Sequence, residues 1–517
     1  MLSTSSKTCQ WDGSFDTSEW KTCQWDGSFD TLQATEAAAA AATAAAAATA
    51  TANARVKGFD HLTRTRVAVL LCAMIMALCC VMPAAAHADV RKADIVVGET
   101  VSSRGLSVSQ CPSIDAAFAY VVDSDGNVYF ERDSEVSTKI ASITKVMTAV
   151  VAVDSVPLNT TITVSSTAAS IGESSAMLQE GDSMPLSEAL KALLLPSGND
   201  AAQAIAESVG ALMLQSAGQD SSDSKACAQA FVDAMNAKCT ELGMTNTVYR
   251  NPHGLDDTEY EGDQHSCAKD QGILVSYAMQ KEAISSVTGQ ESATVKVTRS
   301  GASASVSVTS TDELIGVYDG ACGVKTGYTD YAGACFAGAC QRNGKYLFSV
   351  VLDSTSEASR FEDTTTLWDW VYNNQVSYKL VNTTKTTTYK KTGETVPLVA
   401  QVADATWVDK TIPATVDDPS ASIEVFSLSG NISQTVSYKT IEGDVKAGDV
   451  VGTITYKQRN NVVATQNLIA AEDVPAPNLF EGIGVWWTKF IGGFTGDDCV
   501  ADSVLYNESS LINDKTS

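Results

Sequence analysis

Two side chains near residue 140 could together make a nucleophile. Ser142 and Lys145 are three positions apart, which places the hydroxyl and the ammonium group on one face of a helix about one turn apart. A serine needs a nearby base at neutral pH, and a lysine can be that base when burial or another cation lowers its pKa. The helix N-terminus adds backbone donors where an oxyanion would form. The pair therefore predicts a serine nucleophile with a lysine base.

The spacing of this pair is weak evidence alone, because Ser18–Lys21 and Ser222–Lys225 have it too, one in a leader and one in a polar loop. Two further motifs distinguish Ser142. Ser197-Gly198-Asn199 follows a predicted helix, and Lys325-Thr326-Gly327 lies on a predicted strand. With Ser-Asp-Asn as the usual middle element, this triple is the signature of β-lactamases and penicillin-binding proteins. The three motifs together predict one active site.

Two later segments imitate the second and third motifs. Lys391-Thr392-Gly393 precedes Ser429-Gly430-Asn431, so their order is reversed, and both fall in predicted hairpin turns. We interpret them as turns without a catalytic role.

The pattern around the three motifs predicts an α/β domain over residues 105–376, in which helices flank an antiparallel sheet. Alternating apolar residues predict a hairpin over 117–131 and a second hairpin that turns at Asn343-Gly344. Helical periodicity covers 143–153, 186–195, 201–214 and 362–371. Further strands are predicted at 306–318, 324–329, 333–341 and 345–353.

The chain beyond this domain divides into three parts. Residues 377–476 are rich in Thr and Val with frequent turn residues, which predicts a small β-sandwich. In segment 478–496, apolar residues between Leu479 and Phe494 recur at spacings of three and four. This stripe predicts an amphipathic helix that associates with a membrane surface, and packing on the β-sandwich is the alternative. Residues 497–517 form a polar tail.

The N-terminal segment and the composition indicate an exported protein. Residues 1–88 contain a duplicated segment, an alanine tract, and then a basic, an apolar and a small-residue part, which is the pattern of a signal peptide. Export places the enzyme at the outer face of the cell membrane or in the cell wall. The net charge of −26 argues against a nucleic-acid partner.

Eight cysteines follow the leader, and an even number in an exported protein suggests disulfides. Their pairing is left open. Cys335 and Cys340 should not pair with each other, since an odd separation on a strand puts them on opposite faces.

Three segments that begin at Met177, Leu242 and Tyr318 carry a family resemblance. MLQEGDSMPLSEALKALLLPSGNDAA, LGMTNTVYRNPHGLDD and YDGACGVKTGYTDYAGACFAGA resemble the low-molecular-weight penicillin-binding proteins, the serine-type D-alanyl-D-alanine carboxypeptidases. The resemblance covers about residues 113–375. It implies a β-lactamase/transpeptidase-like domain followed by a small β-rich domain. It also implies removal of terminal D-alanine from peptidoglycan stem peptides, covalent inhibition by β-lactams, and no cofactor or metal.

The resemblance also implies a role for each motif residue in the acylation step. Ser142 would be the acylated nucleophile, Lys145 its base, and Ser197 a proton shuttle toward the leaving amine. Asn199 would bind the amide of the acyl chain. The backbone N–H groups of Ser142 and Tyr328 would form the oxyanion hole.

The remaining residues implied by the resemblance bind the substrate terminus. Lys325 would supply a cation near the substrate carboxylate and lower the pKa of Lys145. Thr326 would contact the same carboxylate, and Arg360 would lie near the substrate terminus. Gly327 would let the substrate backbone approach the edge strand closely.

Several alternatives stay open from the sequence. A D,D-endopeptidase of the same fold would cut cross-links with the same residues. A class A β-lactamase would need a deacylating glutamate after Ser197, and no Glu-x-x-Leu-Asn follows it. A non-catalytic wall-binding protein would not need the motif residues. A zinc or cysteine hydrolase has little support, and His253 in Asn-Pro-His-Gly is interpreted as a turn or packing residue.

Overall fold

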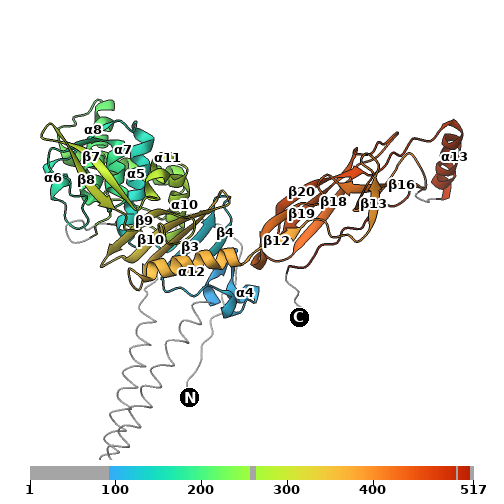
Figure 1. Ribbon diagram of the computed structural model, residues 1–517, viewed down its shortest axis with the longest axis horizontal. Coiled ribbons are helices and arrows are strands. Elements are labelled where there is room, and N and C mark those ends of the chain that lie inside the picture. Colours follow the sequence, from blue (N-terminus) through green and yellow to red (C-terminus); the bar gives the residue numbers. More distant parts are fainter. Residues whose placement is uncertain (1–91, 257–262, 496–498, 513–517) are drawn as a thin grey trace, which may run out of the picture. The chain divides into compact units, whose positions relative to one another are not determined.

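The computed structural model describes residues 92–256, 263–495 and 499–512 (Figure 1). The leader and signal peptide predicted for residues 1–88 lie outside the described residues. We treat the α/β part and the β-rich part in turn.

A seven-stranded antiparallel sheet forms the centre of the α/β part, in the order β2-β1-β4-β3-β11-β10-β9. β9 is therefore an edge strand, and it carries the Lys325 motif. The strands are β1 Ile95–Val96, β2 Glu99–Thr100, β3 Phe118–Asp123, β4 Val128–Arg132, β9 Ala321–Thr329, β10 Gly333–Arg342 and β11 Lys345–Ser354. A smaller antiparallel sheet contains β5 Thr161–Thr163, β6 Ser183–Pro185, β7 Ser292–Arg299 and β8 Ala302–Thr309.

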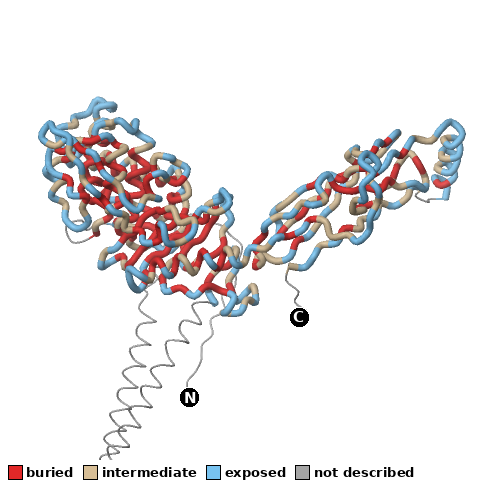
Figure 2. Tube along the Cα trace, viewed as in Figure 1, coloured by how far each residue is buried: buried red, intermediate tan, exposed pale blue. Residues whose placement is uncertain are grey.

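Helices cover both faces of the seven-stranded sheet. α12, Ser359–Asn373, packs on β10 and β11 on one face, and α10, Ala268–Met279, packs on β3 and β11 on the other. The buried strands lie between these layers (Figure 2). The other helices are α4 Val101–Arg104, η1 Val108–Gln110, η2 Ala141–Ile143, α5 Thr144–Ser155, α6 Ser166–Ser170, α7 Leu186–Leu194, α8 Asn199–Ser216, α9 Ser224–Leu242 and α11 Glu282–Thr288.

Most predicted elements of the α/β part are confirmed. The two hairpins form, with β3 paired to β4 and β10 paired to β11. The predicted strand over 306–318 is wrong beyond Thr309, where β8 ends and a turn segment begins. The cause is local hydrogen bonding, because the Asp312 carboxylate accepts the Leu314 N–H and the Ser310 hydroxyl accepts the Asp312 N–H.

The helix α9 was not predicted. It begins within the Ser222–Lys225 segment that was interpreted as a polar loop, and Asp223 caps its N-terminus. The helix packs closely on α8, where a Cβ at Gly210 would lie 1.9 Å from the Cys227 carbonyl oxygen. The buried residues of this helix are only Cys227, Phe231, Val232, Met235 and Cys239. So few apolar positions over the length of the helix give a weak periodic pattern in the sequence.

The β-rich part contains a six-stranded antiparallel sheet in the order β18-β19-β20-β16-β15-β21 and two strand pairs, β12-β17 and β13-β14. Its strands are β12 Gln375–Lys379, β13 Thr386–Tyr389, β14 Glu394–Pro397, β15 Ala400–Ala403, β16 Thr411–Val416, β17 Ser422–Phe426, β18 Ile432–Tyr438, β19 Val450–Gln458, β20 Asn461–Ala470 and β21 Val504–Leu505. Lys391-Thr392-Gly393 is the turn between β13 and β14, as predicted. Ser429-Gly430-Asn431 instead joins the short helix η3, Ser427–Ser429, to β18, because β17 pairs with β12 and not with β18.

A helix follows the β-rich sheet, and the chain then returns to that sheet. α13, Leu479–Thr495, begins where the Asn478 side chain accepts the Phe480 and Glu481 N–H groups. After it, β21 pairs with β15. Asn507 is buried, and its side-chain amide donates to the Leu380 carbonyl and to Gln434. Both ends of α13 are therefore tied to the β-rich sheet.

The disulfides suggested by the even number of cysteines stay a prediction. Among the described residues no disulfide is seen between the eight cysteines, at positions 111, 227, 239, 267, 322, 335, 340 and 499. Cys335 and Cys340 lie in different apolar clusters, one on each face of the sheet, which agrees with the prediction that they do not pair.

Candidate active site

Ser142 and Lys145 meet at the start of α5. Ser142 lies in the short η2 turn that leads into the helix, and Lys145 is in the first turn of α5. The Lys145 Nζ atom is 2.7 Å from Ser142 Oγ, and the Lys145 side chain is fully buried. Burial, followed by the neighbouring Lys325 ammonium, holds the pKa of Lys145 well below its usual value. A neutral amine at hydrogen-bonding distance from a hydroxyl can accept its proton.

The turn Asn251–Gly254 fixes the position of Lys145. The Lys145 Nζ atom donates to the main-chain oxygen of His253 at 2.8 Å, and Thr148 Oγ1 donates to that of Pro252 at 2.6 Å. Gly254 has φ +95°, and a Cβ there would lie 2.0 Å from the Ala141 carbonyl oxygen. The ring of His253 is buried, and its pKa falls to about 3 through burial and the nearby Lys145. The turn interpretation of His253 is confirmed.

The second motif lies in the connection between α7 and α8. Ser197 is buried with φ +63°, and Asn199 begins α8. The Asn199 side chain is 1% exposed; its Nδ2 donates to Gly172 O at 2.9 Å, while its Oδ1 has no partner. A buried carbonyl oxygen without a donor fits an incoming N–H group.

Asp200, the next residue, holds the loop over this connection. Its carboxylate accepts the main-chain N–H groups of Ala176 and Leu178 and the Ser175 hydroxyl. Its charge also opposes, in part, the lowering of the Lys145 pKa. The sequence analysis did not single out Asp200.

The third motif places a second buried lysine on β9. Lys325 is 1% exposed, and its Nζ donates to Thr326 O at 2.9 Å. Burial and the Arg360 charge lower its pKa to about 7. The Thr326 hydroxyl is 2.6 Å from that of Thr311. Lys325 is therefore a cation that titrates near neutral pH.

Gly327 brings β9 against the nucleophile turn. A Cβ at Gly327 would lie 2.8 Å from the Ile140 carbonyl oxygen and 3.2 Å from the Ser142 nitrogen. The sequence analysis explained this glycine by approach of the substrate, whereas the structure shows close packing on the turn that carries Ser142. The next residue, Tyr328, is exposed at the end of the strand.

Arg360 reaches β9 from α12. It is buried; its Nη1 donates to Gly327 O at 3.2 Å, and its Nη2 is 3.0 Å from Glu357 Oε2. Asp312 is a buried carboxyl group whose charge acts on Lys325, and burial raises its pKa to about 6. Its Oδ2 has no hydrogen-bond partner. Asp312 was not predicted as part of the site, since it lies in the segment taken for a strand.

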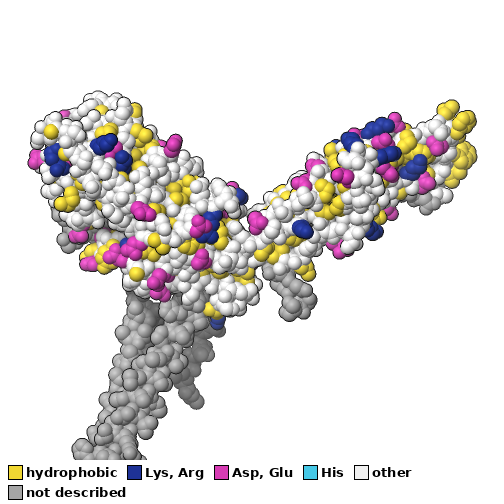
Figure 3. All heavy atoms as spheres, in the orientation of Figure 1, with side chains coloured by type: hydrophobic (Ala, Val, Ile, Leu, Met, Phe, Trp, Pro, Cys, Tyr) yellow, Lys and Arg dark blue, Asp and Glu magenta, His cyan; other side chains and the backbone are white. Residues whose placement is uncertain are grey.

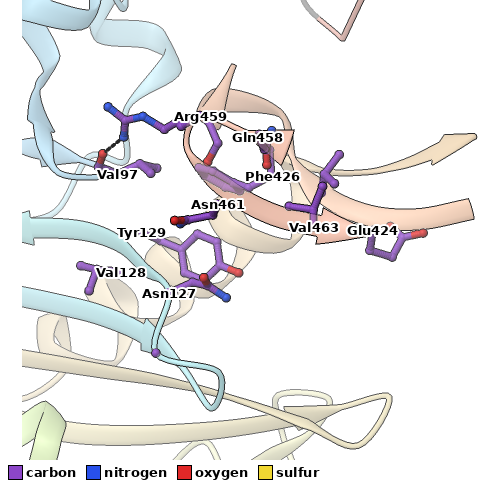
Figure 4. Close-up of a pocket in the computed structure, with 13 residues that line it drawn as sticks. Val97, Asn127, Val128, Tyr129, Glu424, Phe426, Gln458, Arg459, Asn461 and Val463 are labelled. Carbon is purple, nitrogen blue, oxygen red and sulfur yellow. Dashed lines mark hydrogen bonds between the residues drawn. The ribbon is translucent and has the colours of Figure 1, made fainter. Parts of the chain in front are cut away.

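Ser142, Asn199 and Tyr328 line one cavity of about 190 Å³. A larger pocket elsewhere is lined by Tyr129, Phe426 and Arg459 with their neighbours (Figure 4). None of the predicted site residues lines that pocket. The cavity at Ser142 is therefore the candidate active site.

Two family models match the chain. The model described as D-alanyl-D-alanine carboxypeptidase matches residues 106–356, and the model of the C-terminal domain of penicillin-binding protein 5 matches residues 379–476. A D-alanyl-D-alanine carboxypeptidase of Mycobacterium tuberculosis is 33% identical over 48% of this chain and 80% of its own length. The chain belongs to the D-alanyl-D-alanine carboxypeptidase family.

Two further relatives are similar to this chain, and the first of them matches residues of both parts. The carboxypeptidase DacF of Bacillus subtilis is 26% identical over 73% of this chain and 91% of its own length. A D-alanyl-D-alanine endopeptidase of Pseudomonas aeruginosa is 30% identical over 53% of this chain and 82% of its own length. Membership of this family makes the chain a serine-type peptidase, in agreement with the resemblance seen in the sequence. It argues against the β-lactamase and the wall-binding alternatives.

Proposed function

We propose that this carboxypeptidase removes the terminal D-alanine from peptidoglycan stem pentapeptides through an acyl-enzyme on Ser142. The observation that carries the proposal is the contact between Ser142 Oγ and the fully buried Lys145 amine, whose pKa is lowered. A neutral lysine at this distance makes the serine nucleophilic without histidine.

The first half of the reaction breaks the terminal peptide bond. Lys145 accepts the Ser142 proton as Oγ bonds to the penultimate carbonyl carbon, and the N–H groups of Ser142 and Tyr328 stabilise the oxyanion. Lys145 returns this proton through the Ser197 hydroxyl to the departing nitrogen, so that Lys145 is neutral again and free D-alanine leaves. In the second half, Lys145 accepts a proton from water as the water oxygen attacks the ester. Lys145 then gives this proton to Ser142 Oγ, and the shortened peptide is released.

The binding groups lie on both sides of Ser142. Asn199 Oδ1 accepts an N–H group of the acyl chain. This role is supported because the buried oxygen has no hydrogen-bond partner within the described residues. Lys325 and Thr326 bind the terminal carboxylate, and Arg360 adds positive charge beyond Gly327. The β-lactams would acylate Ser142 through the same contacts.

The test is incubation with a defined pentapeptide and a cross-linked muropeptide dimer, followed by mass spectrometry. Loss of one alanine from the pentapeptide supports the carboxypeptidase. Cleavage of the dimer with an intact pentapeptide would favour the endopeptidase instead, which is the activity named for the Pseudomonas aeruginosa relative.

We further propose that α13 attaches the exported enzyme to the membrane surface. All eight apolar residues of its stripe are exposed, from Phe480 at 83% to Ile491 at 46%, and they lie at the tip of the β-rich part (Figure 3). The described residues contain no helix long and apolar enough to cross a membrane. At about 25 cal/mol per Å², burial of such a stripe in the interface supplies several kcal/mol.

Because β21 and Asn507 follow α13, truncation at Pro477 would also remove part of the β-rich sheet. A point change is a cleaner test of attachment. Trp487→Glu should reduce flotation with phospholipid vesicles, whereas Val462→Glu should not, since Val462 is a similarly exposed residue on β20. Equal flotation of both variants would contradict attachment through α13.

A further inference from the structure

Asp312 is a buried carboxyl group whose presence the local turn explains only in part. The residue is 7% exposed, and one carboxylate oxygen, Oδ1, accepts the Leu314 N–H at 2.9 Å. The other oxygen, Oδ2, is buried and has no hydrogen-bond partner within the described residues. An asparagine would make the same turn bond without the cost of a buried carboxylate. The turn therefore does not account for the charge.

The segment that contains Asp312 is attached to β9 beside Lys325. The hydroxyl of Thr311 is 2.6 Å from that of Thr326, the residue that follows the lysine. The Thr311 N–H also donates to the Leu195 carbonyl at 3.1 Å, which ties the segment to the end of α7. These contacts on both sides of the segment hold the carboxyl group in place next to the third motif.

Two buried cations from different elements face the Asp312 carboxylate. Burial raises the pKa of Asp312 to about 6, while the charges of Lys325 on β9 and Arg360 on α12 oppose this rise. The neighbouring Glu313 charge adds to it. The Cys322 thiol of β9 also feels the Asp312 charge, but burial raises its pKa to about 12, so it stays neutral. The carboxylate therefore belongs to a cluster with two positive charges.

Lys325 needs a negative charge nearby if its amine is to stay protonated. Burial and the Arg360 charge lower its pKa to about 7, and Asp312 is the carboxylate among the described residues whose charge opposes that fall. No hydrogen bond joins Asp312 to Lys325 within the described residues. A lysine ammonium has three donors, and the Lys325 Nζ directs its hydrogen bonds to the main-chain and side-chain oxygens of Thr326. The carboxylate therefore acts through space and leaves one donor for a substrate.

We propose that Asp312 is a positioning residue that keeps Lys325 protonated, so that the amine retains the charge with which it binds the substrate carboxylate. The inference rests on the proposed function, in which Lys325 binds that carboxylate. Asp312 acts through the lysine and does not contact the substrate. After burial, the Lys325 charge is also the main cause of the lowered pKa of Lys145. Asp312 therefore favours the neutral form of the base indirectly.

The test is the pH profile of the Asp312→Asn variant on two substrates, a pentapeptide with a free terminal carboxylate and a thioester without one. The ratio of their kcat/KM values follows the charge of Lys325, whereas an effect on the Lys145 base changes both values and cancels. In the unchanged enzyme the ratio falls as pH rises through about 7. In the variant we expect the midpoint of this fall to move about one pH unit toward acid, the scale for the loss of one nearby opposite charge.

Two further variants separate the charge of Asp312 from its place in the turn. Asp312→Ser, whose hydroxyl can also accept the Leu314 N–H, should shift the midpoint in the same direction. Glu313→Gln removes an exposed carboxylate at the next position and should leave the midpoint in place. An unchanged midpoint in both Asp312 variants, or an equal shift in Glu313→Gln, would overturn the inference. Failure of the unchanged enzyme to release D-alanine from the pentapeptide would contradict the proposed function instead.

Discussion

Lys145 is fixed between two oxygen atoms, Ser142 Oγ at 2.7 Å and the main-chain oxygen of His253 at 2.8 Å. The contact with the His253 oxygen orients the Lys145 amine. The contact with Ser142 Oγ can therefore break when the serine is acylated, without loss of the position of the amine. A main-chain oxygen also cannot carry a full negative charge, so it holds the lysine without raising its pKa as a carboxylate would.

Ser142→Ala should abolish covalent labelling by fluorescent penicillin while the thermal unfolding midpoint stays within a few degrees. The substitution removes a single oxygen from a site that is otherwise unchanged. Ser222→Ala is the control, because Ser222 has the same spacing to a lysine but lies before α9. Labelling that persists in the first variant and disappears in the second would refute Ser142 as the nucleophile.

Lys145→Ala should lower the acylation rate at least about a hundredfold, the usual scale for the loss of a positioned base. Stopped-flow measurement with a chromogenic β-lactam gives the rate directly. The thermal midpoint should be measured in parallel, since the change leaves a cavity beside α5. A loss of less than about tenfold would point to a different base.

Lys325 should give the enzyme a basic limb in its pH profile. Its pKa is lowered to about 7, so its positive charge is present below that pH and is lost as pH rises through it. The ratio of kcat/KM for a pentapeptide to that for a thioester without a carboxylate should therefore fall above about pH 7. A ratio that is constant from pH 6 to pH 9, which spans about one to two units around that pKa, would exclude Lys325 as the carboxylate-binding cation.

Arg360→Ala should weaken turnover of substrates with a free terminal carboxylate more than acylation by the neutral thioester. The Arg360 guanidinium also donates to Gly327 O, so its removal could move β9. Such a movement would lower activity on both substrates, whereas loss of a carboxylate-binding cation would lower activity on the carboxylate substrate alone. Glu357→Gln is the matched control, because it removes the ion-pair partner and keeps the cation. Equal losses on both substrates would make Arg360 structural.

Asp312→Asn should stabilise the protein at alkaline pH. Burial raises the pKa of this carboxyl group from 3.8 to about 6, so the folded state favours the protonated form, and that contribution is lost as pH rises through 6. The neutral amide avoids the cost, which is at most about 3 kcal/mol for a shift of this size. Urea unfolding at pH 8 and at pH 3, above and below both pKa values, measures this difference in stability. If the variant is no more stable than the unchanged protein at pH 8, burial does not raise the pKa of Asp312 as proposed.

The sequence was sufficient to predict the elements with strong periodicity. α5, α7 and α8 have continuous apolar faces, and the turn at Asn343-Gly344 determines how β10 pairs with β11. Two of the motifs lie at the starts of α5 and α8, and the third lies within β9, which the alternating apolar pattern also predicted.

The remaining contacts depend on tertiary packing that has no periodic signal. The His253 carbonyl and the Asp312 carboxylate belong to turns, where a main-chain oxygen or one acidic residue gives no pattern to detect. The return of the tail was not anticipated either, because β21 has only two residues and Asn507 is a single buried amide in a polar segment.

The return of the chain to β15 has a consequence for proteolysis. A protease that cuts within α13 would divide the polypeptide without releasing the tail, because β21 and Asn507 hold it by hydrogen bonds to the sheet. The enzyme would then keep its last segment as a separate, non-covalently bound peptide. Nicked and intact protein would migrate together on a native column and separate only in denaturant.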